Sequence, residues 1–184
     1  MQKVQEDFGD ALEIDWQSFL LRPRPEENRD FEKFKKYTES WRRPGGDEPL
    51  CDFQVWQGQE GPPSYSVPPH LVAKAVKDID EASFNRFHDR LFTAYFTDNL
   101  NITDDQVLRN LWREAELPEE GFIKKDDPKF ETAVMNEHNQ AIENGATGVP
   151  ALQLVGNFGA LMGAQSAESY KLMFQRIIEN NKDS

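Results

Sequence analysis

Two kinds of side-chain periodicity divide this sequence, and their order restricts the folds open to it. Residues 12–19 alternate apolar and polar side chains, which is typical of a half-buried β-strand. Residues 151–155 and 158–162 flank a Gly156-Asn157 turn, so we expect a hairpin over 151–162. Between these segments apolar residues recur every three to four positions, as in amphipathic helices. We therefore predict an α/β fold with a large, mostly helical insertion in its sheet.

The helical stretches carry recognisable start and stop signals. Residues 1–9 look like the end of a helix closed by Gly9, and Thr103 with Gln106 forms a capping-box pattern. Ser166 is the expected cap of the last helix, and Ile142 is expected to face inward. One further helix is predicted to begin at Pro25. Helices are also predicted over 70–79, 82–97, the stretch after Thr103 up to Leu117, 128–143 and 167–180.

A long irregular connection interrupts the helical part. Residues 44–69 hold six of the 11 prolines, and Trp56 and Tyr65 indicate that this connection is pinned to a surface. We expect two domains. Residues 1–25 and 146–184 would form a sheet-containing domain, and residues 26–145 would form the inserted helical domain.

Charge and hydropathy exclude several classes of function. The chain has 21 Lys plus Arg against 33 Asp plus Glu, a net charge of -12, which disfavours nucleic acid and anionic membranes as partners. No stretch reaches the roughly 20 apolar residues of a membrane span. The first residues contain no apolar segment of a secretory signal, so we expect a cytoplasmic protein.

The single cysteine, Cys51, limits the chemistry further. An internal disulfide, a Cys-x-x-Cys pair and a thiolate-rich metal site all need more than one thiol. Acidic neighbours disfavour a reactive thiolate at Cys51, so an inert thiol is preferred over a redox-sensitive one. His70, His88 and His138 are scattered, and we expect structural roles for them. No catalytic or metal-binding residue is predicted.

Several short motifs together resemble one known family. They are Trp16-Gln-Ser-Phe-Leu-Leu-Arg-Pro23, Leu91-Phe-Thr-Ala-Tyr-Phe96, Asn101-Ile-Thr-Asp104, Gly148-Val-Pro150 and Gly163-Ala-Gln165. In this order the chain is similar to the DsbA-like branch of the thioredoxin superfamily, and most similar to its cytoplasmic group of polyketide-biosynthesis oxidoreductases. Chromene-carboxylate isomerases and kappa-class glutathione transferases share the architecture. The resemblance implies a thioredoxin-like sheet and thiol–disulfide exchange.

The sequence departs from the family pattern at its beginning. Family members start with a strand followed by Cys-x-x-Cys, or by Ser in the glutathione branch, at the first turn of a helix. Here the first residues already look like the end of that helix, so we expect the first strand and the start of the active-site helix to be missing. Three explanations stay open: a truncated or misassigned start, a fragment, or a natural pseudoenzyme. In the first two cases a strand would be lost from between 12–19 and 151–155. A dimer or a partner chain covering the exposed sheet edges is therefore an expected interaction.

The resemblance assigns two segments to substrate binding. It implies a cis-proline loop at Gly148, Val149 and Pro150, where the backbone of Val149 would pair with an extended substrate or with glutathione. Gly163, Ala164 and Gln165 correspond to the family's loop before the final helix. The alternatives are an ordinary trans-proline at a strand start, and a tight turn with a helix cap. The Phe84–Phe96 run is expected to form a core, with an apolar cleft as the alternative.

The functional expectation follows from these points. We expect a DsbA-family thiol–disulfide oxidoreductase-like protein that lacks dithiol turnover in this form. A glutathione-dependent isomerase or transferase is one alternative, and a non-catalytic binding or regulatory protein is another. The expected partners are a thiol or disulfide substrate or glutathione; no other cofactor is predicted.

Overall fold

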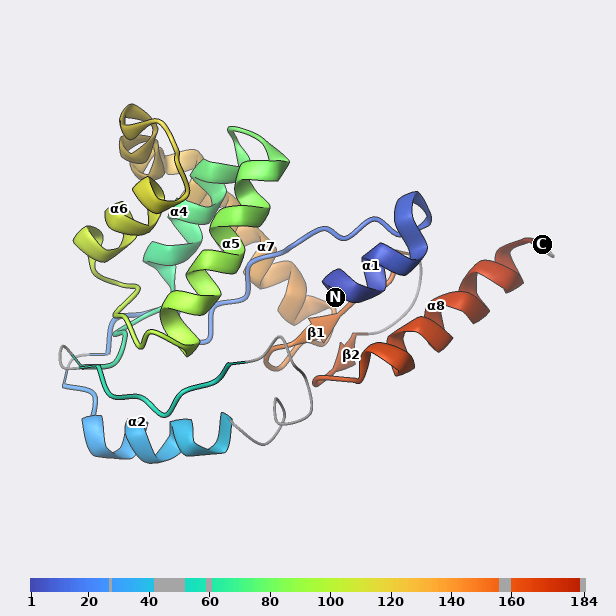
Figure 1. The fold of residues 1–184 in the computed structure, drawn as a ribbon, viewed down its shortest axis with the longest axis horizontal. Helices are drawn as coiled ribbons and strands as arrows, with labels where there is room; N and C mark the ends of the chain where they lie inside the picture. Colours follow the sequence, from blue (N-terminus) through green and yellow to red (C-terminus); the bar gives the residue numbers. More distant parts are fainter. Residues whose placement is uncertain (27, 42–51, 59–60, 156–159, 183–184) are drawn as a thin grey trace. The chain divides into compact units, whose positions relative to one another are not determined.

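The structure is a computed structural model that describes residues 1–26, 28–41, 52–58, 61–155 and 160–182 (Figure 1). It is mostly helical, with one small sheet. In chain order the elements are α1 (Gln2–Phe8), the 3-10 helix η1 (Gly9–Ala11), α2 (Phe31–Thr38), the 3-10 helix η2 (Glu39–Trp41), α4 (Val67–Lys77), α5 (Glu81–Phe96), α6 (Asp105–Glu114), the 3-10 helix η3 (Glu119–Asp126), α7 (Pro128–Glu143), β1 (Ala151–Leu152), β2 (Leu161–Met162) and α8 (Ala167–Lys182).

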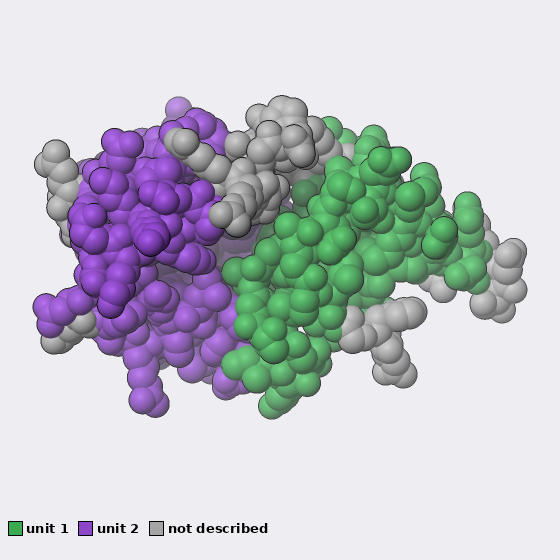
Figure 2. All heavy atoms as spheres, turned by 90° about the horizontal axis from the view of Figure 1, so that it is seen from below, with its two compact units in different colours: residues 1–17, 142–184 green, residues 18–141 purple. Residues whose placement is uncertain are grey.

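The chain divides into two compact units (Figure 2). Unit 1 contains residues 1–17 and 142–184, and unit 2 contains residues 18–141. The expected domain boundaries, after residues 25 and 145, therefore differ from the unit boundaries by several residues. In both divisions the two ends of the chain share one unit and the helical middle forms the other. The assignment of these units as domains stays a prediction.

Unit 2 is built around α4, which packs against α5, α6 and η3. The apolar stripes of these helices meet in a core of large side chains. Its fully buried members include Phe87, Leu108, Leu111, Trp112 and Phe122. Burying a side chain of this size stabilises the fold by roughly 1.5–3 kcal/mol. The core therefore stabilises the helical unit without any contribution from a sheet. The described residues contain no helix that is both long and apolar enough to cross a membrane.

The connection before α4 is pinned to unit 2, as its aromatic residues indicated. Trp56 is fully buried, and its backbone N–H donates to Thr38 Oγ1 at 2.9 Å. The Trp56 ring lies 5.2 Å from that of Phe34 on α2. Hydrogen bonds and ring contacts thus hold an irregular segment in place where no regular element is present.

Residues 12–19 do not form a strand, so that prediction is wrong. The two strands of the described sheet are β1 and β2. Instead, the N–H of Ser18 donates to Glu137 Oε2 at 2.7 Å, and the N–H of Leu20 donates to His138 Nδ1 at 3.1 Å. The alternation correctly indicated an extended backbone at Leu12, but a ladder also needs a neighbouring strand. Side chains of α7 accept the hydrogen bonds that such a strand would have taken.

Unit 1 contains the hairpin and the two terminal helices. In the antiparallel pair of β1 and β2, Ala151 lies opposite Met162 and Leu152 opposite Leu161. Both strands are shorter than expected, and the Gly156-Asn157 turn lies outside the described residues. Also in unit 1, α1 packs against α8. The ring centres of Phe8 and Phe174 are 5.9 Å apart.

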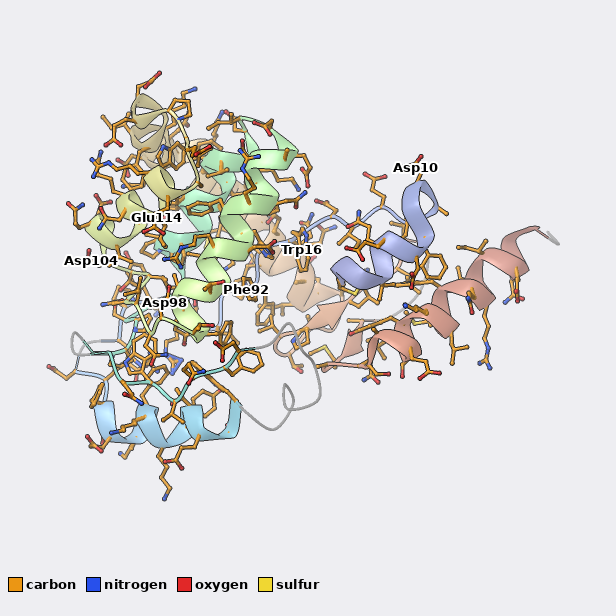
Figure 3. All side chains as sticks on the ribbon, viewed as in Figure 1. Asp10, Trp16, Phe92, Asp98, Asp104 and Glu114 are labelled. Carbon is orange, nitrogen blue, oxygen red and sulfur yellow. The ribbon has the colours of Figure 1, made fainter. Side chains whose placement is uncertain are left out.

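Helix ends agree with the sequence in some places and differ in others. The helix predicted over 128–143 is α7, and Ser166 caps α8 by accepting the N–H of Ser169 at 3.1 Å. The capping box at Thr103 is wrong: the cap of α6 is Asp104, whose Oδ1 accepts the N–H of Val107 at 2.9 Å (Figure 3). The helix expected from Pro25 begins only at Phe31. Ile142 is 50% exposed and does not face a core.

Candidate functional site

The loop of Gly148, Val149 and Pro150 connects α7 to β1. α7 ends at Glu143, and Gly145, two residues further on, has a left-handed φ of 90° that favours glycine and lets the chain turn away from the helix. The Val149–Pro150 peptide bond is cis. The side chain of Val149 is 53% exposed and Pro150 is also exposed, whereas Gly148 is half-buried. The loop therefore presents its backbone and one apolar side chain at the surface of unit 1.

The second predicted segment lies beside this loop. The N–H of Gly163 donates to the carbonyl of Pro150 at 2.9 Å, one residue beyond the pairing of Ala151 with Met162. Gly163 has a φ of 85°, a left-handed conformation that most side chains would disfavour. Ala164 and Gln165 follow in exposed positions. The structure thus brings both segments predicted from the sequence to one end of the hairpin.

Contacts with α1 hold α8, the helix that follows the second segment. Phe174 is almost fully buried, and its ring also stacks on that of Tyr170 at 6.3 Å. Lys171 of α8 forms an ion pair with Asp7 of α1. Because α8 starts two residues after Gln165, these contacts fix the direction in which the Gly163–Gln165 loop leaves β2.

The chemistry of the site follows from its residue types. None of the two glycines, Val149, Pro150, Ala164 or Gln165 can ionise or act as a nucleophile. In the part of the chain that the structure describes, no group forms a hydrogen bond with the backbone N–H or C=O of Val149. Such a loop can pair with an extended ligand through main-chain hydrogen bonds. A reacting thiol has to come from another group.

Cys51, the one thiol of the chain, lies outside the described residues. The described ranges hold no group of three or more His, Cys, Asp and Glu side chains that could bind a metal ion. The role of Cys51 therefore stays a prediction.

Sequence reasoning missed a polar cluster in unit 2, where α4 meets α7. The ammonium group of Lys74 forms an ion pair with Glu137, and both side chains are mostly buried at 13% and 18% exposure. Burial, and then the charge of Lys74, lowers the pKa of His70 to about 4. The ring of His138 accepts the N–H of Leu20. Sequence offered little signal for this cluster, since Lys74 and Glu137 are 63 residues apart.

The Phe84–Phe96 run has a core and an exposed side. Phe84, Phe87 and Leu91 are buried, as expected, but Phe92 is 50% exposed (Figure 3). His88 belongs to this run, and its ring lies 4.7 Å from that of Phe92. A cleft of about 310 Å³ elsewhere in unit 2 is bordered by polar groups and not by this run; its lining is Gln54, Val55, Gln57, Gly58, Thr97, Asp98 and Asn99.

Comparison with known proteins adds a family to this geometry. The family model for the DSBA-like thioredoxin domain matches residues 1–175. No curated protein is significantly similar to the chain in sequence. A crystal structure of a candidate protein disulfide isomerase from Nitrosomonas europaea has a TM-score of 0.77 and 11% identity, covering 97% of this chain and 88% of that one. The cytosolic disulfide reductase DsbM from Pseudomonas aeruginosa has a TM-score of 0.65 and 15% identity, covering 99% and 89%. At these identities the two structures show a shared fold.

Proposed function

Because this chain belongs to the DSBA-like thioredoxin domain family, we propose that its loop at Gly148–Pro150 binds an extended thiol or disulfide substrate. The observation that carries the proposal is the exposed Val149, whose backbone groups have no partner among the described residues. A substrate strand could pair with this N–H and C=O as a further strand pairs with a sheet edge. The same ligand would be bordered by Gly163, Ala164 and Gln165, because the N–H of Gly163 donates a hydrogen bond to the carbonyl of Pro150.

The chain does not complete dithiol turnover by itself. In thiol–disulfide exchange a thiolate attacks one sulfur of a disulfide, the S–S bond breaks, and the other sulfur leaves as a thiolate. A second thiol must then attack the mixed disulfide to release the product. The 184-residue sequence has one cysteine and cannot provide both sulfurs. A second thiol has to come from the substrate, from glutathione or from another chain.

Two assays test this proposal. An insulin-reduction assay with the purified chain should show no multiple-turnover activity, and activity that survives Cys51→Ser would refute the inactivity. For binding, a disulfide-containing peptide is titrated into ¹⁵N-labelled protein. Val149→Ala keeps the backbone donor and should keep the affinity, whereas Val149→Pro removes the N–H and should weaken binding at least tenfold. Val155→Pro, at the exposed far end of the same hairpin, is the matched control. Equal affinities of all three variants would refute backbone recognition.

A glutathione-dependent isomerase or transferase is the second candidate function. It is supported by the absence of ionisable side chains from the six site residues, because glutathione brings its own thiol to such a loop. Calorimetric titration with reduced glutathione separates the two functions. Saturable binding that Val149→Pro weakens, with no binding of the disulfide peptide, would favour the glutathione reaction. Binding of the peptide alone would exclude it.

The non-catalytic alternative is a binding or regulatory protein whose sheet pairs with a partner chain or a second copy. The two-stranded sheet supports it, since each strand has an edge without a described neighbour. Light scattering after size-exclusion chromatography gives the test: a purely monomeric chain over the micromolar range would count against the dimer. We also propose a cytoplasmic location, supported by the single cysteine, and cell fractionation tests it.

A further inference from the structure

Two arginines in unit 2 share a single described carboxylate. Arg22 and Arg29 lie on the segment that leads to α2, and both approach the same oxygen of Glu26. Arg22 Nε is 3.2 Å from Glu26 Oε2, and Arg29 Nε is 3.8 Å from it. The side chain of Arg29 is only 10% exposed, whereas Glu26 is 58% exposed. A buried cation is therefore paired with a largely solvated anion.

Hydrogen bonds hold the backbone of Arg22 and the guanidinium of Arg29 in place. The N–H of Arg22 donates to Ser66 Oγ at 3.0 Å, and the N–H of Ser66 donates back to the Arg22 carbonyl at 2.8 Å. Arg29 Nη1 donates to the carbonyl of Pro63, and its guanidinium lies 4.5 Å from the ring centre of Phe34. The arrangement is therefore built by the fold, and little further ordering would be needed to bind a ligand.

Among the described residues, the charge at this place is not balanced. Burial, and then the positive charge of Arg22, lowers the pKa of Arg29, and the opposing effects of Tyr95 and Glu26 do not restore it. Two positive charges and one negative charge thus meet among the described residues, in a chain with a net charge of -12. An additional anion would relieve the repulsion between the two guanidinium groups.

A second pair of arginines in the chain provides the contrast. Arg109 and Arg113 also share one carboxylate, that of Glu119, but through hydrogen bonds of 2.7–2.9 Å. Hydrogen bonding to Glu119 raises the pKa of Arg113. Both guanidinium groups at Glu119 are hydrogen-bonded to their carboxylate, whereas among the described residues Arg22 and Arg29 approach Glu26 only as ion pairs.

The site also contains a hydrogen-bond donor that has no acceptor among the described residues. Arg22 Nε is buried and makes no well-directed hydrogen bond, in spite of its proximity to Glu26. The ring of Tyr95 lies 5.6 Å from that of Trp56, and the Trp56 ring lies 5.2 Å from that of Phe34, the ring that Arg29 contacts. Burial raises the pKa of Tyr95 to about 12. The positive charges of Arg29 and Arg22 partly offset this shift in the pKa of Tyr95.

We propose that Arg22 and Arg29 form a binding site for an oxyanion such as a carboxylate or a phosphate. Guanidinium groups suit this chemistry because their planar N–H pairs match two oxygens on one centre. The site consists only of residues of unit 2 and is distinct from the loop at Gly148–Pro150.

The test uses inorganic phosphate and acetate as probes for the two ligand types. Each is titrated into the full-length ¹⁵N-labelled chain at low ionic strength, with the arginine Nε–H signals as the readout. We expect shifts of the Arg22 and Arg29 signals with a dissociation constant of about 1 mM for at least one probe, as two charge-assisted contacts allow. Binding of phosphate alone assigns a phosphate ligand, and equal binding of acetate assigns a carboxylate.

Matched variants decide whether the proposed arginines are responsible. Arg22→Gln should weaken binding at least tenfold, and Arg22→Lys, which keeps the charge, should weaken it less. Arg113→Gln is the control and should leave the affinity unchanged. The proposal is overturned if neither probe binds the wild-type chain, if Arg22→Gln binds as well as wild type, or if Arg113→Gln causes an equal loss. A dispersed amide spectrum of each variant establishes that the fold is retained.

Discussion

The half-buried histidine of α4, His70, makes the stability of unit 2 depend on pH. His70 has a pKa of about 4 in the folded chain against 6.5 when unperturbed, because burial and the charge of Lys74 disfavour the imidazolium. The folded state therefore binds fewer protons than the unfolded state between these two values. The contribution of the neutral ring is fully present above pH 6.5 and is lost as the pH falls towards 4.

The size of this effect follows from the two pKa values. Between pH 7.5 and pH 5.0 the difference in proton binding lowers the free energy of unfolding by about 2 kcal/mol. Other groups titrate in the same range, so the prediction concerns the difference between wild type and His70→Gln. The variant cannot take up this proton and should lose about 2 kcal/mol less than wild type over the same interval.

Urea denaturation at pH 7.5 and pH 5.0, followed by tryptophan fluorescence, measures this difference. The comparison is independent of the absolute stability of His70→Gln, since each protein is compared with itself at the two pH values. His88→Gln is a control on α5 and should change the pH dependence less, because Asp89 opposes the lowering of the His88 pKa, whereas Lys74 adds to the lowering of the His70 pKa. Identical pH dependence in wild type and His70→Gln would show that His70 is not held neutral by its surroundings.

Three further substitutions test the packing and the helix ends, each by urea denaturation. Gly121→Ala would put a Cβ 2.8 Å from the buried ring of Trp112, and we expect a loss of about 1–3 kcal/mol; an unchanged midpoint would mean that the ring moves at no cost. Asp104→Ala should lower the free energy of unfolding by about 1 kcal/mol because it removes the cap of α6. Thr103→Ala should lower it by less, and the reverse order would support the capping box predicted from the sequence. Phe174→Ala should cost about 3–5 kcal/mol because the ring is almost fully buried, and a loss below 1 kcal/mol would indicate that α1 and α8 do not hold unit 1 together.

Local signals in the sequence were sufficient for most helices. The helix over 128–143 has an N-terminal proline and ends before Gly145, and these signals act within one turn of the backbone. Ser166 was identified as a cap for the same reason. The assignment of Thr103 failed because Asp104 is an equally good cap one position further along, and local propensity does not choose between them.

Contacts between distant residues could not be predicted in the same way. The alternation over 12–19 indicated an extended backbone, but whether it joins a sheet depends on what lies beside it. In this structure Glu137 and His138, more than a hundred residues away, accept the N–H groups of Ser18 and Leu20. Ile142 has the right spacing for a core position, yet it is 50% exposed because nothing described covers that turn of α7.

For the candidate site, the sequence alone determined which residues are present, that they cannot ionise, and that the chain has a single thiol. The tertiary structure decided that Gly163 forms a hydrogen bond with Pro150 and that Arg22 and Arg29 lie against Ser66 and Pro63. The physical reason is the range of the forces involved. Turn, cap and periodicity preferences depend on neighbours in the chain, whereas burial, charge balance and hydrogen-bond partners depend on which distant segments the fold brings into contact.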